Sequence, residues 1–386
     1  MMKPKTEAEL AGMVGAASGP LHVFGGGTRP VGKPVTGEAL SLADLSGIVD
    51  YEPGALTLVA KAGTPVAEIE AALAAEGQRL AFEPMDHRAL LGTQGTPTIG
   101  GVVAANVSGP RRVSVGAARD SLLGVRFVDG SGRVLKNGGR VMKNVTGYDL
   151  VKLLAGSHGT LGVLSEVSFK VLPTPEAVRT LVVHGVTGVE ALDAMTRAIT
   201  SPFEVSGAAH LPGDDPRVLL RIEGFAGSVA YRAGQLTSLL ADLGEISEIA
   251  TPEDNAGLWR AVRDAEALKD RANVWRISMT PGAMVNGLLQ ALGDDARSYI
   301  LDWAGGLCWL GADGGPEALH HRLQSLVADR AVNAGGGGHV TLVKGDAALR
   351  ASVPVFQPEP APIAALARGL REKFDPKGIL NPGLMG

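Results

Sequence analysis

Three glycine-rich segments contain the residues whose types and spacing best suit ligand binding. The first is Gly25-Gly26-Gly27-Thr28-Arg29, which directly follows the apolar run Leu21–Phe24. Consecutive glycines leave successive backbone N–H groups free of Cβ atoms, and such a row of donors suits a phosphate or pyrophosphate. The alternative is a plain tight turn between two strands. The sequence therefore predicts either an anion cradle or a turn at this position.

Two nucleotide-binding motifs are incomplete in the same segment. The run Gly27–Lys33 matches a Walker A loop, but Pro34 stands where that motif needs Ser or Thr to hold magnesium. Pro30 also replaces the third glycine of a dinucleotide fingerprint that would begin at Gly25. We therefore expect neither a P-loop nor a Rossmann fingerprint here.

The second and third segments mix glycine with small and hydroxyl-bearing residues. The second extends from Gly95 to Gly109, and the third from Gly156 to Val167. Small residues let a flat ligand lie against the backbone, although a buried packing seam would have the same composition. Backbone groups at Gly162 and Val163 could pair with an adenine edge. The candidate ligand-binding residues of these two segments are Thr98, Ile99, Gly100, Gly101, Asn106, Ser108, Gly109, Gly159, Thr160, Gly162 and Val163.

Composition excludes several functional classes. The chain has 386 residues, 36 basic and 40 acidic side chains and a net charge of -4, so it lacks the basic footprint of a nucleic-acid-binding protein. No apolar stretch approaches the roughly 20 residues needed to span a bilayer. Cys308 is the only cysteine, so the chain can form neither an internal disulfide nor a four-thiolate iron–sulfur cluster. A cytoplasmic location is the expectation.

Secondary-structure signals divide the chain near residue 175. Thr6–Glu9 reads as a capping box that opens a helix reaching about Ala17, and Thr64 as the cap of a helix that begins at Pro65. Strands are expected at 21–24, 48–51, 56–62, 78–82, 122–128, 133–136 and 162–172, with a helix over 148–155. After Pro173-Thr174-Pro175, strand-like runs at 181–184, 218–222, 274–278 and 307–310 alternate with helical ones at 189–199, 231–242 and 316–328. A last helix over 361–373 precedes the tail.

These segments together resemble the FAD-binding oxidases of the vanillyl-alcohol-oxidase (PCMH-type) family, over nearly the whole chain. The motifs are Gly25–Arg29, Thr98–Gly101 with Asn106–Gly109, Gly116–Asp120, Gly147–Leu150, Gly156–Val163 and the tail Asp375–Gly383. Within the family, the run Gly139–Asp149 is similar to that of the FAD-binding subunits of glycolate oxidase complexes.

The resemblance implies an α+β fold with FAD between two α+β subdomains, followed by an α+β cap domain. The implied limits are 1–175 for the FAD-binding domain, with subdomains 1–85 and 86–175, 176–345 for the cap, and 346–386 for a segment that returns to the FAD domain. Gly25–Arg29 and Thr98–Gly101 would line the pyrophosphate and flavin, and Gly159–Val163 the adenine side. His22 and His87 are weak candidates for covalent attachment, so we expect noncovalent FAD.

The implied activity is oxidation of a small 2-hydroxy acid such as glycolate. Arg276 and Lys344 are the candidates for holding the substrate carboxylate, and His339 is the candidate base. Relatives that oxidise such acids carry histidine-rich metal motifs, whereas this chain has Gly335–Gly338 before His339. We therefore predict no metal site.

The implied partners are a longer catalytic FAD subunit and an iron–sulfur subunit, through which the chain would attach peripherally to the inner membrane. The alternative function is a noncatalytic subunit that carries FAD for electron transfer or supports the complex as a scaffold.

Overall fold

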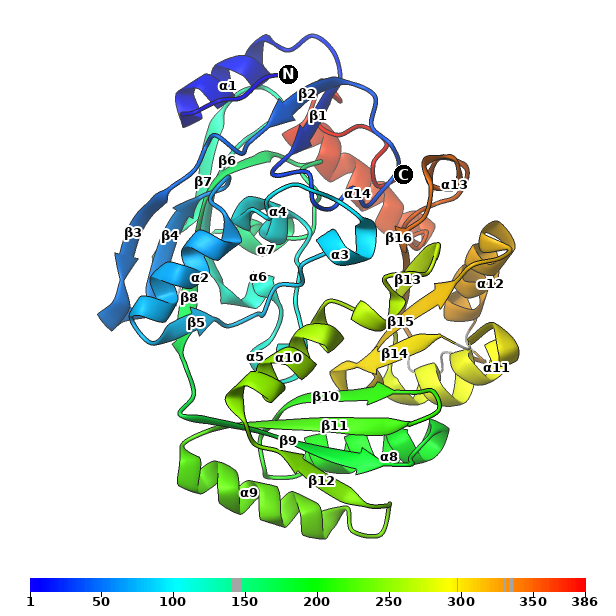
Figure 1. Cartoon of the computed structure of the whole chain (residues 1–386). Helices are drawn as coiled ribbons and strands as arrows, with labels where there is room; N and C mark the ends of the chain where they lie inside the picture. The colour runs from blue at the N-terminus through cyan, green and yellow to red at the C-terminus, as the bar shows by residue number, and fades with distance from the viewer. Residues whose placement is uncertain (141–146, 297, 330, 333–335) are drawn as a thin grey trace.

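The computed structural model describes residues 1–140, 147–296, 298–329, 331–332 and 336–386. Three sheets and their covering helices form the molecule (Figure 1). The strands up to residue 173 are β1 (Leu21–Phe24), β2 (Glu38–Ser41), β3 (Ile48–Glu52), β4 (Thr57–Lys61), β5 (Gln78–Leu80), β6 (Leu122–Val128), β7 (Val134–Gly138) and β8 (Val163–Pro173). The helices of this part are α1 (Glu7–Ala16), α2 (Val66–Ala75), α3 (Arg88–Leu91), α4 (Ile99–Ala104), α5 (Arg112–Val115), α6 (Ala118–Ser121) and α7 (Leu150–Leu154).

The first part contains one antiparallel sheet in the order β3-β4-β8-β6-β7, with β5 on another stretch of β8, and a separate parallel pair, β1 and β2. β8 is the longest strand, and most of its residues are buried because it lies between β4 and β6. Strands on both sides of residue 85, the predicted subdomain limit, share this sheet. Its last strand ends at Pro173.

The second part contains an eight-stranded sheet that begins at Ala177. Its strands are β9 (Ala177–His184), β10 (Val205–Leu211), β11 (Arg217–Gly224), β12 (Ile246–Ile249), β13 (Asn273–Ser278), β14 (Tyr299–Asp302), β15 (Leu307–Ala312) and β16 (His339–Lys344). Every pairing is antiparallel, in the order β12-β9-β11-β10-β14-β15-β13-β16. Its helices are α8 (Gly188–Thr200), α9 (Ala226–Leu239), α10 (Pro252–Arg263), α11 (Gln290–Leu292) and α12 (Pro316–Ala328), with the π-helix Ala283–Leu289 before α11.

The two faces of the larger sheet pack against different helices. Val183 and Leu220 belong to the main core, which α8 and α9 complete with Ala194 and Leu236. The adjacent strand residues Val182 and Leu219 face the other way, where they pack with Trp259 of α10. Because strand side chains alternate between faces, β9 and β11 contribute to both layers. The layer with α10 faces the first part of the chain (Figure 1).

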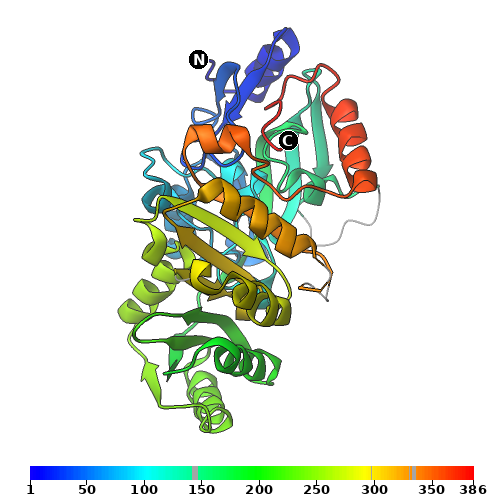
Figure 2. The ribbon, with the colours of Figure 1, turned by 90° about the vertical axis from the view of Figure 1, so that its right-hand side faces the viewer.

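The C-terminal segment packs against the first part of the chain. After β16 come α13 (Ala347–Ser352) and α14 (Ala361–Phe374), and α14 lies beside the N-terminal sheets (Figure 2). The rings of Phe374 and Phe127 are 6.0 Å apart, and Leu21 N donates to Ile379 O at 2.7 Å. None of the helices in the described residues combines the length and apolar character needed to cross a bilayer.

The expected strands and helices are confirmed, with local corrections. The Thr6 hydroxyl caps α1 by accepting from Glu9 N, but the Glu9 carboxylate accepts from Lys5 N and so does not close the box. The predicted Thr64 cap is wrong. The Thr64 hydroxyl donates to Gly47 O and Lys61 O, and α2 begins at Val66 without a side-chain cap. Residues 141–146 and Gly335, which belong to predicted motifs, lie outside the described residues. The domain limits stay a prediction.

Candidate FAD-binding and active site

A pocket of about 420 Å³ lies where the three glycine-rich segments meet. The first segment follows β1, the second enters α4, and the third links α7 to β8. The predicted ligand-binding residues that line this pocket are Gly25, Gly26, Gly27, Thr28, Arg29, Thr98, Gly100, Gly101, Gly159, Gly162 and Val163. The structure thus brings together residues from three separate regions of the sequence.

Two of the glycines in the first segment are required by contact between loops. A Cβ atom on Gly26 would overlap the carbonyl oxygen of Thr96, and one on Gly25 would overlap the Thr98 hydroxyl. Gly27 has φ +71°, and a Cβ there would meet nothing within 4 Å. The glycine run therefore allows the first two loops to pack closely and leaves open space at its end.

Gly101 is different, because its open side faces the pocket. Thr98 caps α4, with its hydroxyl accepting from Gly101 N at 3.4 Å. Gly100 packs against the backbone and methyl group of Ala62, whereas a Cβ on Gly101 would meet only the Thr98 hydroxyl, at 3.2 Å. Gly101 also lines the pocket. The missing side chain at this position therefore leaves room for a ligand.

The pocket is electrostatically one-sided. Arg29, Lys33 and Arg350 line it, and no Asp or Glu among the described residues does. Arg29 donates from Nη1 to Gly101 O at 2.8 Å and from Nε to His87 Nδ1 at 3.3 Å, without a carboxylate in ion-pair range in the described parts of the chain. Burial lowers the pKa of Arg29 to about 10, so it remains a cation near neutral pH. Cations without neighbouring carboxylates suit a pyrophosphate.

Arg350 and Asn381 are pocket residues that the sequence reasoning missed. Arg350 of α13 donates from Nη1 to Pro30 O and to Gly32 O, the latter at 3.2 Å. Asn381 accepts from Val23 N at 2.7 Å and donates to His158 O at 2.9 Å. Both residues come from the C-terminal segment, and no local pattern links them to the glycine segments. The C-terminal segment therefore completes the pocket wall, because Asn381 bonds Val23, which is 358 residues earlier in the chain.

Five predicted ligand-binding residues do not line the pocket. Ile99 is fully buried, and the Thr160 hydroxyl donates to Ser157 O at 2.7 Å. Asn106 Oδ1 accepts from Arg119 N at 3.0 Å, Ser108 Oγ accepts from Ala118 N at 2.9 Å, and Gly109 N donates to Phe82 O at 2.9 Å. The side chains of Asn106 and Ser108 accept from backbone N–H groups of α6, so they brace the loop between α4 and α6.

A second cationic group lies at the junction with the larger sheet. The guanidinium carbons of Arg112 and Arg276 lie 4.4 and 5.0 Å from the ring centroid of Trp303. Trp303 donates from Nε1 to Gly109 O at 3.0 Å. Neither arginine has a carboxylate in ion-pair range within the described residues. Burial, and secondarily Arg112, lowers the pKa of Arg276 to about 10, which leaves both side chains charged and available to an anion.

Backbone strain and a buried carboxyl accompany this arrangement. Trp303 and Ala304 are consecutive non-glycine residues with φ +53° and +55°, a conformation that costs roughly 1–3 kcal/mol per residue. Asp302 is buried and accepts from Trp303 N at 2.7 Å. Burial raises the pKa of Asp302 to about 7. Strain held in place by surrounding contacts is typical of functional sites.

His87 is bonded to Arg29 and is also affected by the charge of Arg276. It is buried and accepts the hydrogen bond from Arg29. Burial is the largest cause that holds the pKa of His87 well below its usual value, followed by Arg29. His87 is therefore neutral near pH 7.

The other predicted catalytic residues are placed differently. His339 opens β16, is exposed and pairs with Ser278, while Thr341 pairs with Arg276. Lys344 is at the other end of β16, about 16 Å from His339 at the usual rise per residue. Its Nζ donates to Lys269 O at 2.6 Å. Arg276 lies in the middle of β13, two residues from Ser278, which pairs with His339, and two residues from Val274, which pairs with Lys344. The described residues contain no group of three His, Cys, Asp or Glu side chains placed to hold a metal.

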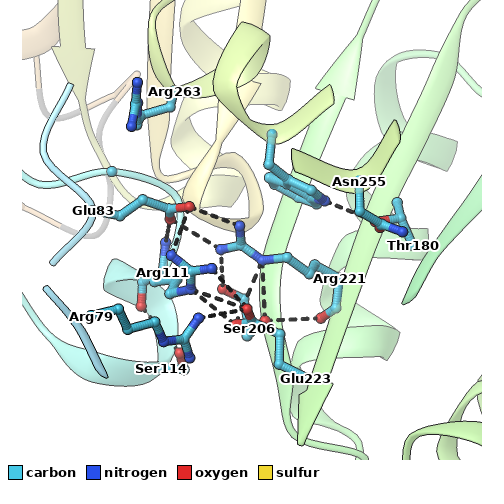
Figure 3. Close-up of polar contacts among 12 residues, drawn as sticks. Arg79, Glu83, Arg111, Ser114, Thr180, Ser206, Arg221, Glu223, Asn255 and Arg263 are labelled. Atoms are coloured by element: carbon cyan, nitrogen blue, oxygen red, sulfur yellow. Dashed lines mark hydrogen bonds and ion pairs between the residues drawn. The ribbon is translucent and has the colours of Figure 1, made fainter. Parts of the chain in front are cut away.

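A buried ion network joins the two parts of the chain (Figure 3). Arg79, Glu83 and Arg111 come from the first part, and Arg221 and Glu223 come from β11. The Glu83 carboxylate pairs with Arg111 at 2.9 Å and with Arg221 at 3.0 Å. The Glu223 carboxylate pairs with Arg79 and with Arg111, both at 2.8 Å. This network fixes the larger sheet against the residues that carry the cofactor pocket.

Comparison with known proteins gives consistent results. A family model described as FAD binding domain matches residues 1–138. Glycolate oxidase subunit GlcE of Escherichia coli K12 is 34% identical over 95% of this chain and 92% of its own length. Glycolate oxidase subunit GlcD of Bacillus subtilis is 25% identical over 93% of this chain and 81% of its own. A solved alkyldihydroxyacetonephosphate synthase superposes with a TM-score of 0.70 at 18% identity, covering 98% of this chain and 76% of that one, which shows a shared fold.

Proposed function

This chain belongs to the PCMH-type FAD-linked oxidoreductase family, and on that premise we propose that it is the FAD-binding subunit of a glycolate oxidase complex. The observation that supports this most directly is the pocket formed by the three glycine segments, with cations and no carboxylate among its described lining residues. The similarity of the chain to GlcE extends over almost the full length of both proteins. The proposed substrate class is a small 2-hydroxy acid.

The residues that line the pocket fit FAD, which we propose to be held noncovalently. Backbone N–H groups of Gly25–Thr28, with Arg29 and Arg350, would hold the pyrophosphate. Gly101 leaves the room required beside the flavin, and Gly162 and Val163 would face the adenine. When bound, FAD supplies the two-electron redox chemistry that no side chain of this protein can provide.

The remaining tasks belong to the protein. In our proposal, Arg112 and Arg276 hold the substrate carboxylate, since both lack a carboxylate partner in the described chain and both contact the ring of Trp303. His339, on the strand that pairs with the strand of Arg276, is the proposed acceptor of the hydroxyl proton. Lys344 is held by a carbonyl at the other end of β16, so we assign it no contact with substrate.

Electrons must leave through partner subunits under this proposal. Cys308 is the only cysteine, and it is buried. We therefore propose a longer catalytic flavoprotein subunit and an iron–sulfur subunit as partners, since the relatives are themselves named as subunits. Peripheral attachment to the inner membrane would follow from such a partner.

One observation favours a second candidate, a noncatalytic subunit that carries FAD. The ring of Trp303 already lies against both guanidinium groups, and its N–H is fixed on Gly109 O. In that arrangement a substrate carboxylate would have to compete with the indole for the arginines.

The test is to purify the chain with its flavin and add glycolate without oxygen. Bleaching of flavin absorbance in the wild type, lost in Arg276→Gln and retained in Lys344→Gln, supports direct oxidation. Bound flavin that stays oxidised until the longer subunit is added supports the second candidate. A folded chain that binds no flavin refutes both.

A further inference from the structure

The charges of the junction network do not balance. Three guanidinium groups, from Arg79, Arg111 and Arg221, share the carboxylates of Glu83 and Glu223. Their side chains are between 1% and 21% exposed. No third carboxylate lies within 4 Å of these arginines in the described parts of the chain. A net positive charge removed from water is costly unless another anion offsets it.

One donor of this network also lacks a partner. Arg79 donates from Nη1 to Glu223 at 2.8 Å, but its Nε is buried and has no hydrogen-bond partner among the described residues. Buried donors in native proteins are nearly always satisfied by protein, water or ligand. The position of Arg79 is therefore incomplete in both charge and hydrogen bonding.

A cavity of about 790 Å³ adjoins this network. It lies between α2 and α10 and shares no lining residue with the cofactor pocket. Arg79, Arg111 and Arg221 line its network side. It is larger than the cofactor pocket and accessible to solvent, so an ion can reach the exposed part of the Arg79 side chain from outside.

The opposite wall of the cavity adds positive charge. Trp259, Arg260 and Arg263 lie on the face of α10 that lines it. Arg263 pairs with Asp264 at 2.8 Å, whereas Arg260 is exposed and has no carboxylate within 4 Å among the described residues. The carboxylates that line the cavity are Glu70, Glu83 and Glu176, of which Glu83 is already paired with Arg111 and Arg221. Among the described residues that line the cavity, six are arginines and three are glutamates, so the lining carries an excess of positive charge from both parts of the molecule.

We propose that this cavity is a second ligand site, which binds a small oxyanion, either a carboxylate or a phosphate, between Arg79 and Arg260. The anion offsets the excess positive charge of the network beside the partly exposed Arg79 side chain. Because the two arginines belong to different parts of the chain, the bound anion also stabilises the arrangement of the two sheets. The site is independent of FAD and of the proposed oxidation.

The experiment is calorimetric titration of the FAD-loaded protein with inorganic phosphate and, separately, with acetate, each against potassium chloride at equal ionic strength. Loaded FAD keeps the cofactor pocket from contributing an anion site. Saturable binding of phosphate or acetate beyond chloride is expected, and the tighter of the two identifies the natural class.

Two variants locate the site. Arg79→Gln balances the charges of the network and removes one of the two proposed anion-binding cations, so it should weaken anion binding about tenfold or more. Arg260→Gln changes an exposed residue outside the network, so it should weaken binding without altering unfolding in chloride. Arg368→Gln, an exposed arginine on α14, is the matched control. Absence of saturable binding, or equal binding in both variants and the control, overturns the proposal.

Discussion

Glu223→Gln is the sharpest perturbation of the junction network. The Glu223 carboxylate accepts from Arg79 Nη1 at 2.8 Å and from Arg111 Nε and Nη2 at 3.0 and 2.8 Å, and its side chain is 6% exposed. Glutamine keeps the shape but removes the charge, which leaves Arg79 without a carboxylate in the described residues and Arg111 and Arg221 with Glu83 alone. Breaking a buried pair by losing one partner costs about 3–5 kcal/mol, and we expect a loss of that size.

The assay compares unfolding of the variant with that of a surface control. Glu248→Gln removes the partner of Arg179, a pair in which both side chains are 34% exposed, and should cost about 1 kcal/mol or less. Urea unfolding followed by circular dichroism measures the two losses. Amide hydrogen exchange should show faster opening at β11 and α5 in Glu223→Gln, because these segments carry the network.

The pH dependence provides an independent check. The pKa of Glu223 is lowered because its arginine partners, Arg221 first, outweigh the opposing effect of burial. Its stabilising contribution is therefore complete above the unfolded pKa of about 4.3 and is lost as the pH falls below it. The variant should lack this part of acid destabilisation. A loss no larger than that of Glu248→Gln, or an unchanged acid limb, would refute the reasoning.

Three further predictions concern the cofactor pocket and the strained turn. Gly101→Val places a branched side chain in open pocket space, so it should lower FAD affinity about tenfold or more while the circular dichroism spectrum stays unchanged. The control Gly12→Ala in α1 should leave FAD affinity unchanged. Equal flavin content in the two variants would place FAD elsewhere. Arg350→Gln should weaken FAD binding about tenfold to a hundredfold but leave the binding of riboflavin, which has no pyrophosphate, unchanged. Flavin fluorescence measures both affinities. Equal losses for the two ligands would show that Arg350 supports the loop instead. The pKa of Asp302 is raised to about 7, so between about pH 4 and 7 the native state binds more protons than the unfolded state, and stability falls as the pH rises through this range. Asp302→Asn should flatten this pH dependence of the free energy of unfolding, as measured by urea unfolding. An unchanged slope would contradict the assignment.

Local sequence signals predicted the elements and the glycine segments well. Alternation and turn chemistry depend on neighbouring residues, so the hairpin of β6 and β7 around Gly130 follows from the sequence alone. The capping predictions were less reliable, because Thr64 has two competing uses for one hydroxyl. The Thr64 hydroxyl donates to Lys61 O and does not cap α2. The Thr98 hydroxyl, by contrast, caps the helix that follows it, α4. Local propensity does not decide between such uses.

Contacts between distant residues could not be predicted in the same way. Asn381 bonds Val23 across 358 residues, and Arg350 reaches the loop at Pro30 from beyond the larger sheet. Each is one polar residue in an ordinary surface-like stretch, and nothing in its neighbours indicates the partner. The same holds for Asn106 and Ser108, whose composition suits a ligand but whose polar atoms are used by the backbone of the next loop.

The distribution of charge explains why anion binding dominates the described sites. Near the junction, Glu83 and Glu223 are both held by arginines, so neither can neutralise Arg29, Arg112 or Arg276. Asp302 is bonded to the backbone of Trp303, and its raised pKa makes it a weak counter-charge at neutral pH. The unpaired arginines therefore keep their charge along one path from the glycine segments to the larger sheet. A cofactor pyrophosphate at one end and a substrate carboxylate at the other are the ligands that such a path can bind without rearranging the carboxylates that hold the fold together.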